Sequence, residues 1–344
     1  MSARAFITGV EGLALTADEW AFLRETLPWG LILFRRNIET PDQIRRLVDA
    51  FREAVGRDDA PVLIDQEGGR VQRLGPPHWS AYPPGRVYSV LYDQDRDVGL
   101  AAARLGARLI AQDLEALGIN VDCLPLADVP VAGANPVIGD RAYGNNPVKV
   151  AAIARAVSDG LLDAGVLPVL KHLPGHGRAN ADSHEGLPVV GEDRATLEAT
   201  DFAAFRPLAD LPLGMTAHVV YTAVDPAAPA TTSPTVIEEV IRGFIGFDGA
   251  LMSDDLSMGA LSGTLAERTR ASFRAGCDLV LHCNGRFDEM QSVAAETPLL
   301  AGRALERAAA ALRQCKKPVD IDVAAARAEF SSMMGRISDS AAAT

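Results

Sequence analysis

The segment "NPVKVAAIARAVSDGLLDAGVLPVLKH", residues 146–172, joins a helix signal to a strand signal. Asn146 is a favourable N-cap, Pro147 fits the first helical position, and Gly165 can end the helix. The following run, "VLPVLKHLP" (166–174), is apolar almost throughout. Such a strand is buried on both faces, as in a parallel sheet that helices cover.

The same pairing recurs along the chain. Apolar, strand-like runs occur at residues 6–10, 30–34, 61–67, 119–129, 166–174, 213–221, 249–255 and 277–284. Between them, Thr16, Thr40 and Ser233 stand where helix N-caps are expected, and we expect the helix after Ser233 to end at Gly243. Eight such strands alternating with helices predict an α/β fold, a single (β/α)8 TIM barrel. An open, doubly wound sheet is the alternative.

The composition is that of a large globular domain. Of 344 residues, 48% are hydrophobic, and we expect residues 1–336 to form the barrel domain and residues 337–344 a disordered tail. Lys and Arg total 33 against 45 Asp and Glu, a net charge of −12, which disfavours nucleic acid as a partner because phosphate binding needs clustered cations.

The location and assembly can also be predicted. No apolar run approaches the roughly 20 residues that a membrane span needs. The N-terminal residues lack the apolar core of a signal peptide, and the four cysteines form no CxxC pair. We therefore expect a cytoplasmic monomer with no cofactor, no bound metal and no membrane association.

Polar side chains gather at the C-terminal ends of the apolar runs. They are Asp65, Glu67, Asp128, Lys171, His172, His218, Asp254, Asp255, His282 and Asn284. Barrel enzymes place their active sites at this end of the strands, so one site is expected there.

The motif "MSDDLSM", residues 252–258, places two carboxylates at a strand end. Successive strand side chains point to opposite sides, so only one of Asp254 and Asp255 is expected to face the barrel mouth. An inward aspartate there could be a nucleophile, a general base or a metal ligand. The alternative is a simple helix N-cap.

The motif "IDQEGGRVQR", residues 64–73, combines a carboxylate with arginines. Asp65 and Arg73 could bind the hydroxyls of a sugar, and paired glycines let the chain turn sharply. The glycines match neither a dinucleotide-binding motif nor a P-loop. The alternative is a surface salt bridge from Glu67 to Arg70 or Arg73.

The motif "KHLPGHGRANADSHEGLP", residues 171–188, is rich in histidine. Asp182 stands two residues before His184, and a carboxylate that holds an imidazole is typical of an oriented general acid/base. The glycines between His172 and Asp182 suggest a hinge. The alternative is that Asp182 only caps a helix or turn and that His184 is exposed. The spacing of His172 and His176 also allows a metallohydrolase, although nearby proline and glycine disfavour the helix that such spacing usually needs.

Taken together, "DQEGGRVQR", "KHLPGHG…ADSH" and "SDDLSM", in this order, resemble glycoside hydrolase family 3, and within it the bacterial β-N-acetylhexosaminidases of the NagZ type. The resemblance implies the nucleophile Asp254, the acid/base His184 and Asp182, which holds that histidine. It further implies sugar-binding residues at Asp65, Arg73, Arg141, Lys171 and His172. Leu173 and Tyr143 depart from the family pattern, where phenylalanine is common, without removing a polar group.

The resemblance implies a retaining hydrolysis of β-linked GlcNAc through a covalent intermediate. The implied substrate is GlcNAc joined to 1,6-anhydro-MurNAc, with or without a peptide, in peptidoglycan recycling. Rival hypotheses are attack by the substrate's own 2-acetamido group, a β-glucosidase or β-xylosidase of the same fold, a metal-dependent hydrolase and a non-catalytic sugar-binding barrel.

Overall fold

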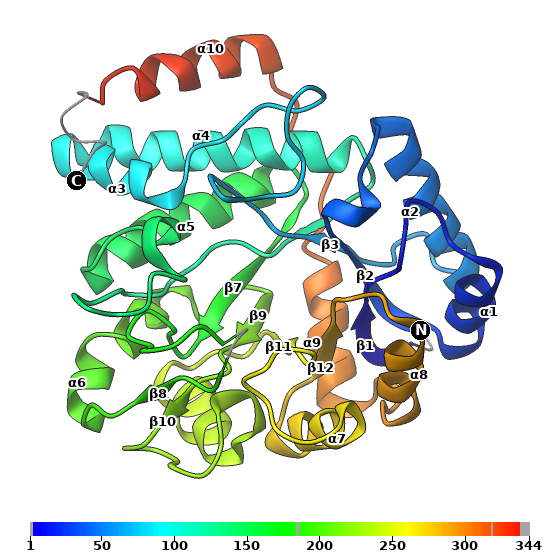
Figure 1. The fold of residues 1–344 in the computed structure, drawn as a ribbon. Helices are drawn as coiled ribbons and strands as arrows, with labels where there is room; N and C mark the ends of the chain where they lie inside the picture. The colour runs from blue at the N-terminus through cyan, green and yellow to red at the C-terminus, as the bar shows by residue number, and fades with distance from the viewer. Residues whose placement is uncertain (1–2, 184–185, 318, 338–344) are drawn as a thin grey trace.

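In the computed structural model, which describes residues 3–183, 186–317 and 319–337, eight parallel strands close into a barrel (Figure 1). In barrel order, they are β1 (Arg4–Thr8), β12 (Leu279–His282), β11 (Ala250–Asp255), β9 (Leu213–Thr216), β7 (Leu167–Leu173), β6 (Val121–Asp122), β3 (Val62–Ile64) and β2 (Pro28–Leu33). Each overlaps one of the eight apolar runs. The predicted single (β/α)8 barrel is confirmed, and the open sheet was the wrong alternative.

Helices surround the barrel. They are α1 (Ala17–Thr26), α2 (Pro41–Val55), α3 (Gly85–Gln94), α4 (Arg96–Glu115), α5 (Pro147–Asp163), α6 (Arg194–Ala199), η6 (Val236–Phe244), α7 (Leu265–Ala275), α8 (Phe287–Ala295), α9 (Gly302–Leu312) and α10 (Val323–Met334). Short 3-10 turns lie at Arg35–Asn37, Gly139–Arg141, Phe202–Ala204, Arg206–Leu208 and Ala230–Thr232. The predicted caps form: the side chains of Thr16, Thr40 and Asn146 each accept a backbone N–H of the following turn.

The end of helix η6 corrects one prediction. Its start is as expected, since the Ser233 hydroxyl accepts the N–H of Val236. The helix does not stop at Gly243 but continues to Phe244, and the chain reverses at Gly246, where φ is +79°. Gly246 therefore supplies the left-handed residue that Gly243 was expected to supply.

Alternate strand residues build two layers of core. Ile7, Leu63 and Val169 belong to the cluster inside the barrel. Their strand neighbours, among them Phe6 and Leu170, belong to the cluster between the barrel and the helices. This alternation follows from the two-residue period of a strand, and the almost fully apolar runs reflect burial on both faces.

Three smaller features complete the fold. β4 (Gln66–Gly68) and β5 (Val71–Gln72) form a hairpin after β3, and β8 (Val189–Val190) pairs with β10 (Val220–Tyr221). Helix α10 lies along α4, where Arg327 pairs with Asp113 at 2.9 Å (Figure 1). Of the expected tail 337–344, only Ile337 is among the described residues.

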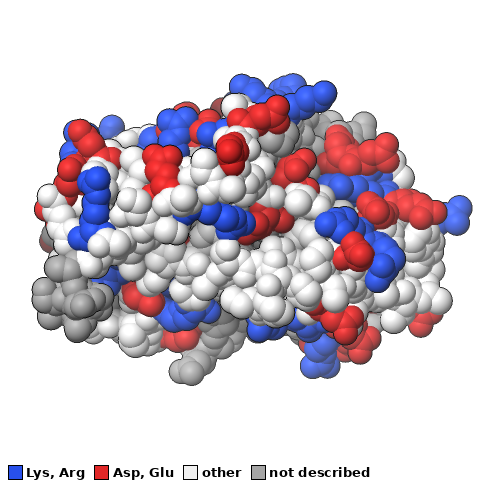
Figure 2. Space-filling view, turned by 90° about the horizontal axis from the view of Figure 1, so that it is seen from above, with Lys and Arg blue, Asp and Glu red and all other residues white. Residues whose placement is uncertain are grey.

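Charged side chains of both signs are interspersed on the face seen in Figure 2. Among the described helices, none is long and apolar enough to cross a bilayer.

Candidate active site

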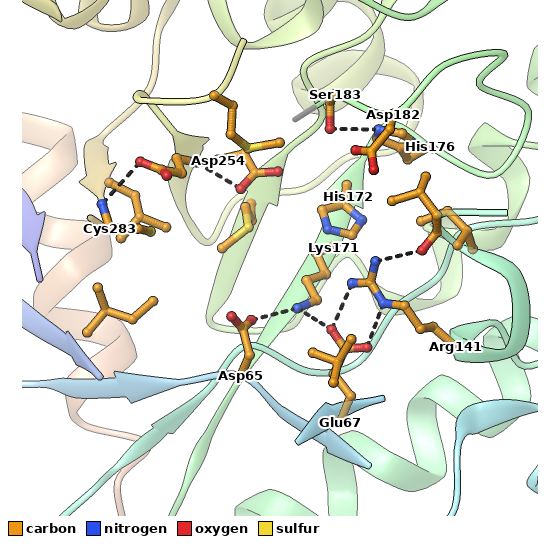
Figure 3. A pocket seen from close by; sticks show the side chains of 18 of the residues that line it. Asp65, Glu67, Arg141, Lys171, His172, His176, Asp182, Ser183, Asp254 and Cys283 are labelled. Atoms are coloured by element: carbon orange, nitrogen blue, oxygen red, sulfur yellow. Dashed lines mark hydrogen bonds and ion pairs between the residues drawn. The ribbon is translucent and has the colours of Figure 1, made fainter. Parts of the chain in front are cut away.

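A cavity of about 330 Å³ lies at the C-terminal ends of the barrel strands (Figure 3). Seven of the eight residues singled out from the sequence contribute to its lining: Asp65, Arg73, Arg141, Lys171, His172, Asp182 and Asp254. The eighth, His184, lies outside the described residues. Four loops and strands far apart in the sequence thus bring their polar residues to one place, at the barrel end where the sequence predicted a site.

One wall of the cavity is a network of ion pairs. The Lys171 ammonium lies 3.0 Å from Asp65 and 2.7 Å from Glu67. Arg73 contacts the other oxygen of Asp65 at 3.0 Å, and Arg141 forms a two-pronged pair with Glu67 at 2.8 Å per contact. Lys171 is only 2% exposed, so it needs these carboxylates to remain charged.

The network holds its carboxylates ionised. Burial opposes ionisation of Glu67, but Arg141 and Lys171 outweigh it and lower the pKa to about 2. At Asp65, burial is likewise overcome by Lys171 and Arg73, and the pKa lies well below its usual range. Fixed charges with several N–H donors and carboxylate acceptors suit the hydroxyls of a sugar ring.

Asp254 is the second-last residue of β11 and lines another side of the cavity (Figure 3). Its Oδ1 accepts the N–H of Asp255 at 2.8 Å, and no described residue donates a hydrogen bond to its other oxygen. Burial favours its neutral form, but His218, His172, the Asp255 N–H and Lys171 together lower the pKa below its usual value. Asp254 is therefore an ionised carboxylate with an oxygen available to a ligand.

Asp255 corrects a second prediction, because it also contributes to the cavity lining. The register between β11 and β12 shifts between Met252 and Asp255, so the alternation expected of a regular strand breaks down. Hydrogen bonds distinguish the two carboxylates instead. Asp255 accepts N–H groups of Ser257 and Cys283 at 3.1 Å and the Ser257 hydroxyl, so both of its oxygens are occupied.

His172 is oriented by a buried carboxylate. Its Nδ1 lies 2.8 Å from Asp128, which also accepts the backbone N–H of His176 at 2.6 Å. Burial raises the pKa of Asp128, but His172 and His176 lower it to about 2 overall. The ionised Asp128 fixes a hydrogen on Nδ1 and leaves Nε2 of His172 as the atom able to meet a ligand.

Other residues of the lining are apolar. They include Ile32, Phe34, Met215, Met258 and Leu281. The guanidinium of Arg73 lies 5.3 Å from the Phe34 ring centre, which helps to hold that arginine in place. A lining with both polar and apolar residues fits a ligand with both hydroxyl and alkyl surface.

Glu67 was expected at a strand end, but the sequence assigned it no partner or role in the site. It was expected, if structural, to pair at the surface with Arg70 or Arg73, whereas it is 7% exposed and pairs with Arg141 and Lys171. Arg70 instead pairs with Asp140 at 2.9 Å. The position of Glu67 two residues after Asp65 was the available signal, since residues two apart on an extended chain point to the same side.

Gly177, one of the glycines interpreted as a hinge, also has a packing role. A Cβ there would lie 2.3 Å from the Val129 carbonyl carbon. Gly177 is therefore required for close packing of two backbones. Gly68, with φ of +96°, serves a sharp turn as expected.

Within the described ranges, no three His, Cys, Asp or Glu side chains are grouped so as to hold a metal ion. The described part of the cavity presents an ionised carboxylate, an oriented imidazole and a wall of buried ion pairs.

The sequence also matches a known family. The model of the glycosyl hydrolase family 3 N-terminal domain matches residues 10–311, which is most of the chain. The chain belongs to glycoside hydrolase family 3. A β-hexosaminidase of Alkalilimnicola ehrlichii is 43% identical over 280 residues, covering 80% of this chain and 79% of the relative. A β-hexosaminidase of Xanthomonas axonopodis pv. citri is 38% identical over 311 residues, covering 88% and 89%.

Solved structures of this family share the fold. NagZ from Neisseria gonorrhoeae, in complex with N-trifluoroacetyl-D-glucosamine, superposes with a TM-score of 0.87 at 31% identity, covering 97% of this chain and 99% of that one. A family 3 β-N-acetylglucosaminidase from Paenibacillus superposes with a TM-score of 0.83 at 30% identity, covering 96% and 66%. The predicted family and enzyme class, a family 3 glycoside hydrolase of the β-hexosaminidase group, are confirmed.

Proposed function

We propose that this enzyme is a retaining β-N-acetylhexosaminidase that removes terminal β-linked GlcNAc, with GlcNAc-1,6-anhydro-MurNAc and its peptides as substrates in peptidoglycan recycling. The observation that carries the proposal is Asp254: an ionised carboxylate with one oxygen that accepts no hydrogen bond from the described residues, in the same cavity as a charged, sugar-compatible wall. The sugar bound by the Neisseria relative is a GlcNAc analogue, which supports the choice of sugar.

In the proposed first step, Asp254 attacks the anomeric carbon and His184 donates a proton to the departing oxygen. The bond to the aglycone breaks as a bond from Asp254 to the sugar forms. Asp182 stabilises the protonated form of His184. In the second step, neutral His184 takes a proton from water, which attacks the glycosyl ester and restores Asp254.

The remaining residues hold the sugar. Asp65, Arg73, Lys171 and His172 are proposed to bind hydroxyls directly, and Arg141 is proposed to bind the sugar while Glu67 fixes its orientation. Because these groups are already paired and buried, little reorganisation is needed when the substrate arrives.

Asp255 bears on the rival mechanism in which the 2-acetamido group attacks. That route needs a carboxylate to orient the acetamido group beside the general acid. Both oxygens of Asp255 are occupied by Ser257 and Cys283, which supports direct attack by Asp254 instead. No cofactor takes part in the proposed reaction. We propose that the enzyme works as a cytoplasmic monomer, in line with four free cysteines.

The proposal is tested by comparing aryl β-GlcNAc with aryl β-glucoside under one set of conditions, followed by the natural disaccharide. We expect kcat/KM to be at least about 100-fold higher for the GlcNAc substrate. The glucoside lacks the 2-acetamido group and therefore loses the polar and apolar contacts that this group would make with the enzyme. Equal values for the two sugars would contradict the proposed substrate class.

A further inference from the structure

His176 has no part in the proposed chemistry, yet it is buried beside the catalytic residues. It is 3% exposed and lines the cavity. Its ring meets His172 edge to face, with 5.7 Å between ring centres. Its backbone N–H donates to Asp128 at 2.6 Å, so the residue is fixed to the barrel by its main chain and its ring.

The side chain of His176 reaches the segment that contains Asp182. Its Nε2 lies 3.2 Å from the hydroxyl of Ser183, which is itself 3% exposed (Figure 3). Ser183 is the residue between Asp182 and position 184. The Ser183 carbonyl also accepts the N–H of Ala260, six residues after Asp254, at 3.0 Å. Ser183 is therefore held from two sides, by the loop after β7 and by the loop after β11.

The protonation state of His176 decides which of the two side chains donates this hydrogen bond. Burial, with the neighbouring His172, lowers the pKa of His176 to about 4, so the ring is neutral at neutral pH. Its Nδ1 is buried and has no hydrogen-bond partner in the described structure. An unpaired buried N–H is costlier than an unpaired acceptor, so the hydrogen belongs on Nε2, which donates to the Ser183 oxygen.

We propose that His176 is a positioning residue that fastens the segment carrying Asp182 to the barrel through the Ser183 hydroxyl. This inference rests on the proposed function, in which Asp182 and His184 manage the proton. The neutral His176 ring is neither the acid nor the base. Its donated hydrogen bond fixes where Ser183 and the neighbouring Asp182 lie relative to Asp254, because Asp128 holds the backbone of His176 and the His172 ring packs against its ring.

The kinetic test compares four variants: His176→Leu, His176→Gln, Ser183→Ala and the double variant His176→Leu/Ser183→Ala. The value measured is kcat/KM, which covers steps up to loss of the aglycone. With a GlcNAc disaccharide, whose leaving group needs a proton, His176→Leu and Ser183→Ala should each lose about 3- to 10-fold. With an activated aryl β-GlcNAc, each loss should be clearly smaller.

Two comparisons separate positioning from a structural effect. Because each single variant breaks the same hydrogen bond, the double variant should lose no more kcat/KM than the more impaired single variant. His176→Gln, whose amide N–H can reach Ser183, should recover most of the disaccharide activity. Equal losses on both substrates, or additive losses in the double variant, would overturn the proposal. His78→Leu, which removes an exposed imidazole, is the matched control and should leave both values unchanged.

A measurement without substrate keeps this inference separate from the proposed function. Amide hydrogen exchange of peptides covering 177–183 should speed up by at least about threefold in His176→Leu and in Ser183→Ala, with exchange of the barrel strands unaltered. Unchanged exchange would overturn the fastening, whatever the activity shows. If His176→Leu fails to fold, Ser183→Ala breaks the same bond and gives the same decision. Loss of the GlcNAc preference alone would contradict only the proposed function.

Discussion

Glu67 and Arg141 form a two-pronged ion pair, with both contacts at 2.8 Å, beneath the polar wall of the cavity. The pair joins the hairpin after β3 to the 3-10 turn Gly139–Arg141, and Lys171 extends it to β7. One buried carboxylate therefore holds two of the residues that are proposed to bind the sugar.

Glu67→Gln should lower the free energy of unfolding at pH 7 by about 3 kcal/mol, because it leaves two buried cations short of a partner. The pKa of Glu67 is 4.5 when unfolded and about 2 when folded, so its contribution is complete above pH 4.5 and is lost as the pH falls toward 2. In urea unfolding, the gap between wild type and variant should therefore shrink from pH 7 to pH 3. The exposed Glu25→Gln is the control, and a gap independent of pH would refute this account.

The pH dependence of kcat/KM tests the ionisation of Asp254. Its pKa lies below the usual 3.8, so the Asp254 carboxylate stays charged throughout the range in which the enzyme can be assayed. With an activated aryl β-GlcNAc, which needs little acid assistance, kcat/KM should not fall between pH 7 and pH 5. A fall in kcat/KM above pH 5 that follows protonation of Asp254 would contradict this account. It would show that burial, rather than the surrounding donors, sets the pKa of Asp254.

His184→Ala should lower kcat/KM by an amount that depends on the leaving group of the substrate. A general acid contributes about 10²- to 10⁴-fold, and only where the departing oxygen needs a proton. We expect a loss of at least about 100-fold in kcat/KM for the disaccharide and a much smaller loss for an aryl glycoside with an acidic phenol. Equal losses on the two substrates would remove His184 from the role of acid.

Chelation addresses the metallohydrolase alternative raised by the spacing of His172 and His176. The proposed steps use a carboxylate and an imidazole, so dialysis against EDTA should leave kcat/KM within about twofold of its starting value. A loss that added zinc restores would establish a metal requirement and would redirect the roles of these histidines.

Local signals made most of the fold predictable. Apolar runs of the right length, caps such as Thr16 and glycines after helices are short-range features, and they produced the barrel strands nearly in full. The chain reversal at Gly246, after the helix ends at Phe244, was missed because glycine at 243 satisfies the same local rule, and only the packed chain determines which glycine adopts positive φ. Helix α10 has no capping pattern that was recognised, and its place on α4 depends on a long-range contact of Arg327 with Asp113.

Site residues at the ends of strands could be predicted from the sequence. The ion pairs that join residues far apart in the sequence could not. Asp65, Lys171 and Asp254 follow apolar runs, and a closed parallel barrel necessarily brings such ends together. The ion pair of Glu67 was not predicted because its partner Arg141 lies 74 residues away, and sequence spacing alone cannot show that pairing. The bulge that turns Asp255 toward the cavity is likewise a property of the β11–β12 register.

The central claim, a covalent bond between the sugar and Asp254, is tested most directly by mass spectrometry after incubation with a 5-fluoro GlcNAc donor, which slows hydrolysis of the glycosyl enzyme. The account predicts a mass increase of one fluorosugar, found in the proteolytic peptide containing Asp254 and absent in Asp254→Ala, whose turnover should be lower by about 10³-fold or more. A label on Asp255, or steady turnover of the donor with no labelled Asp254 at any time, would contradict it.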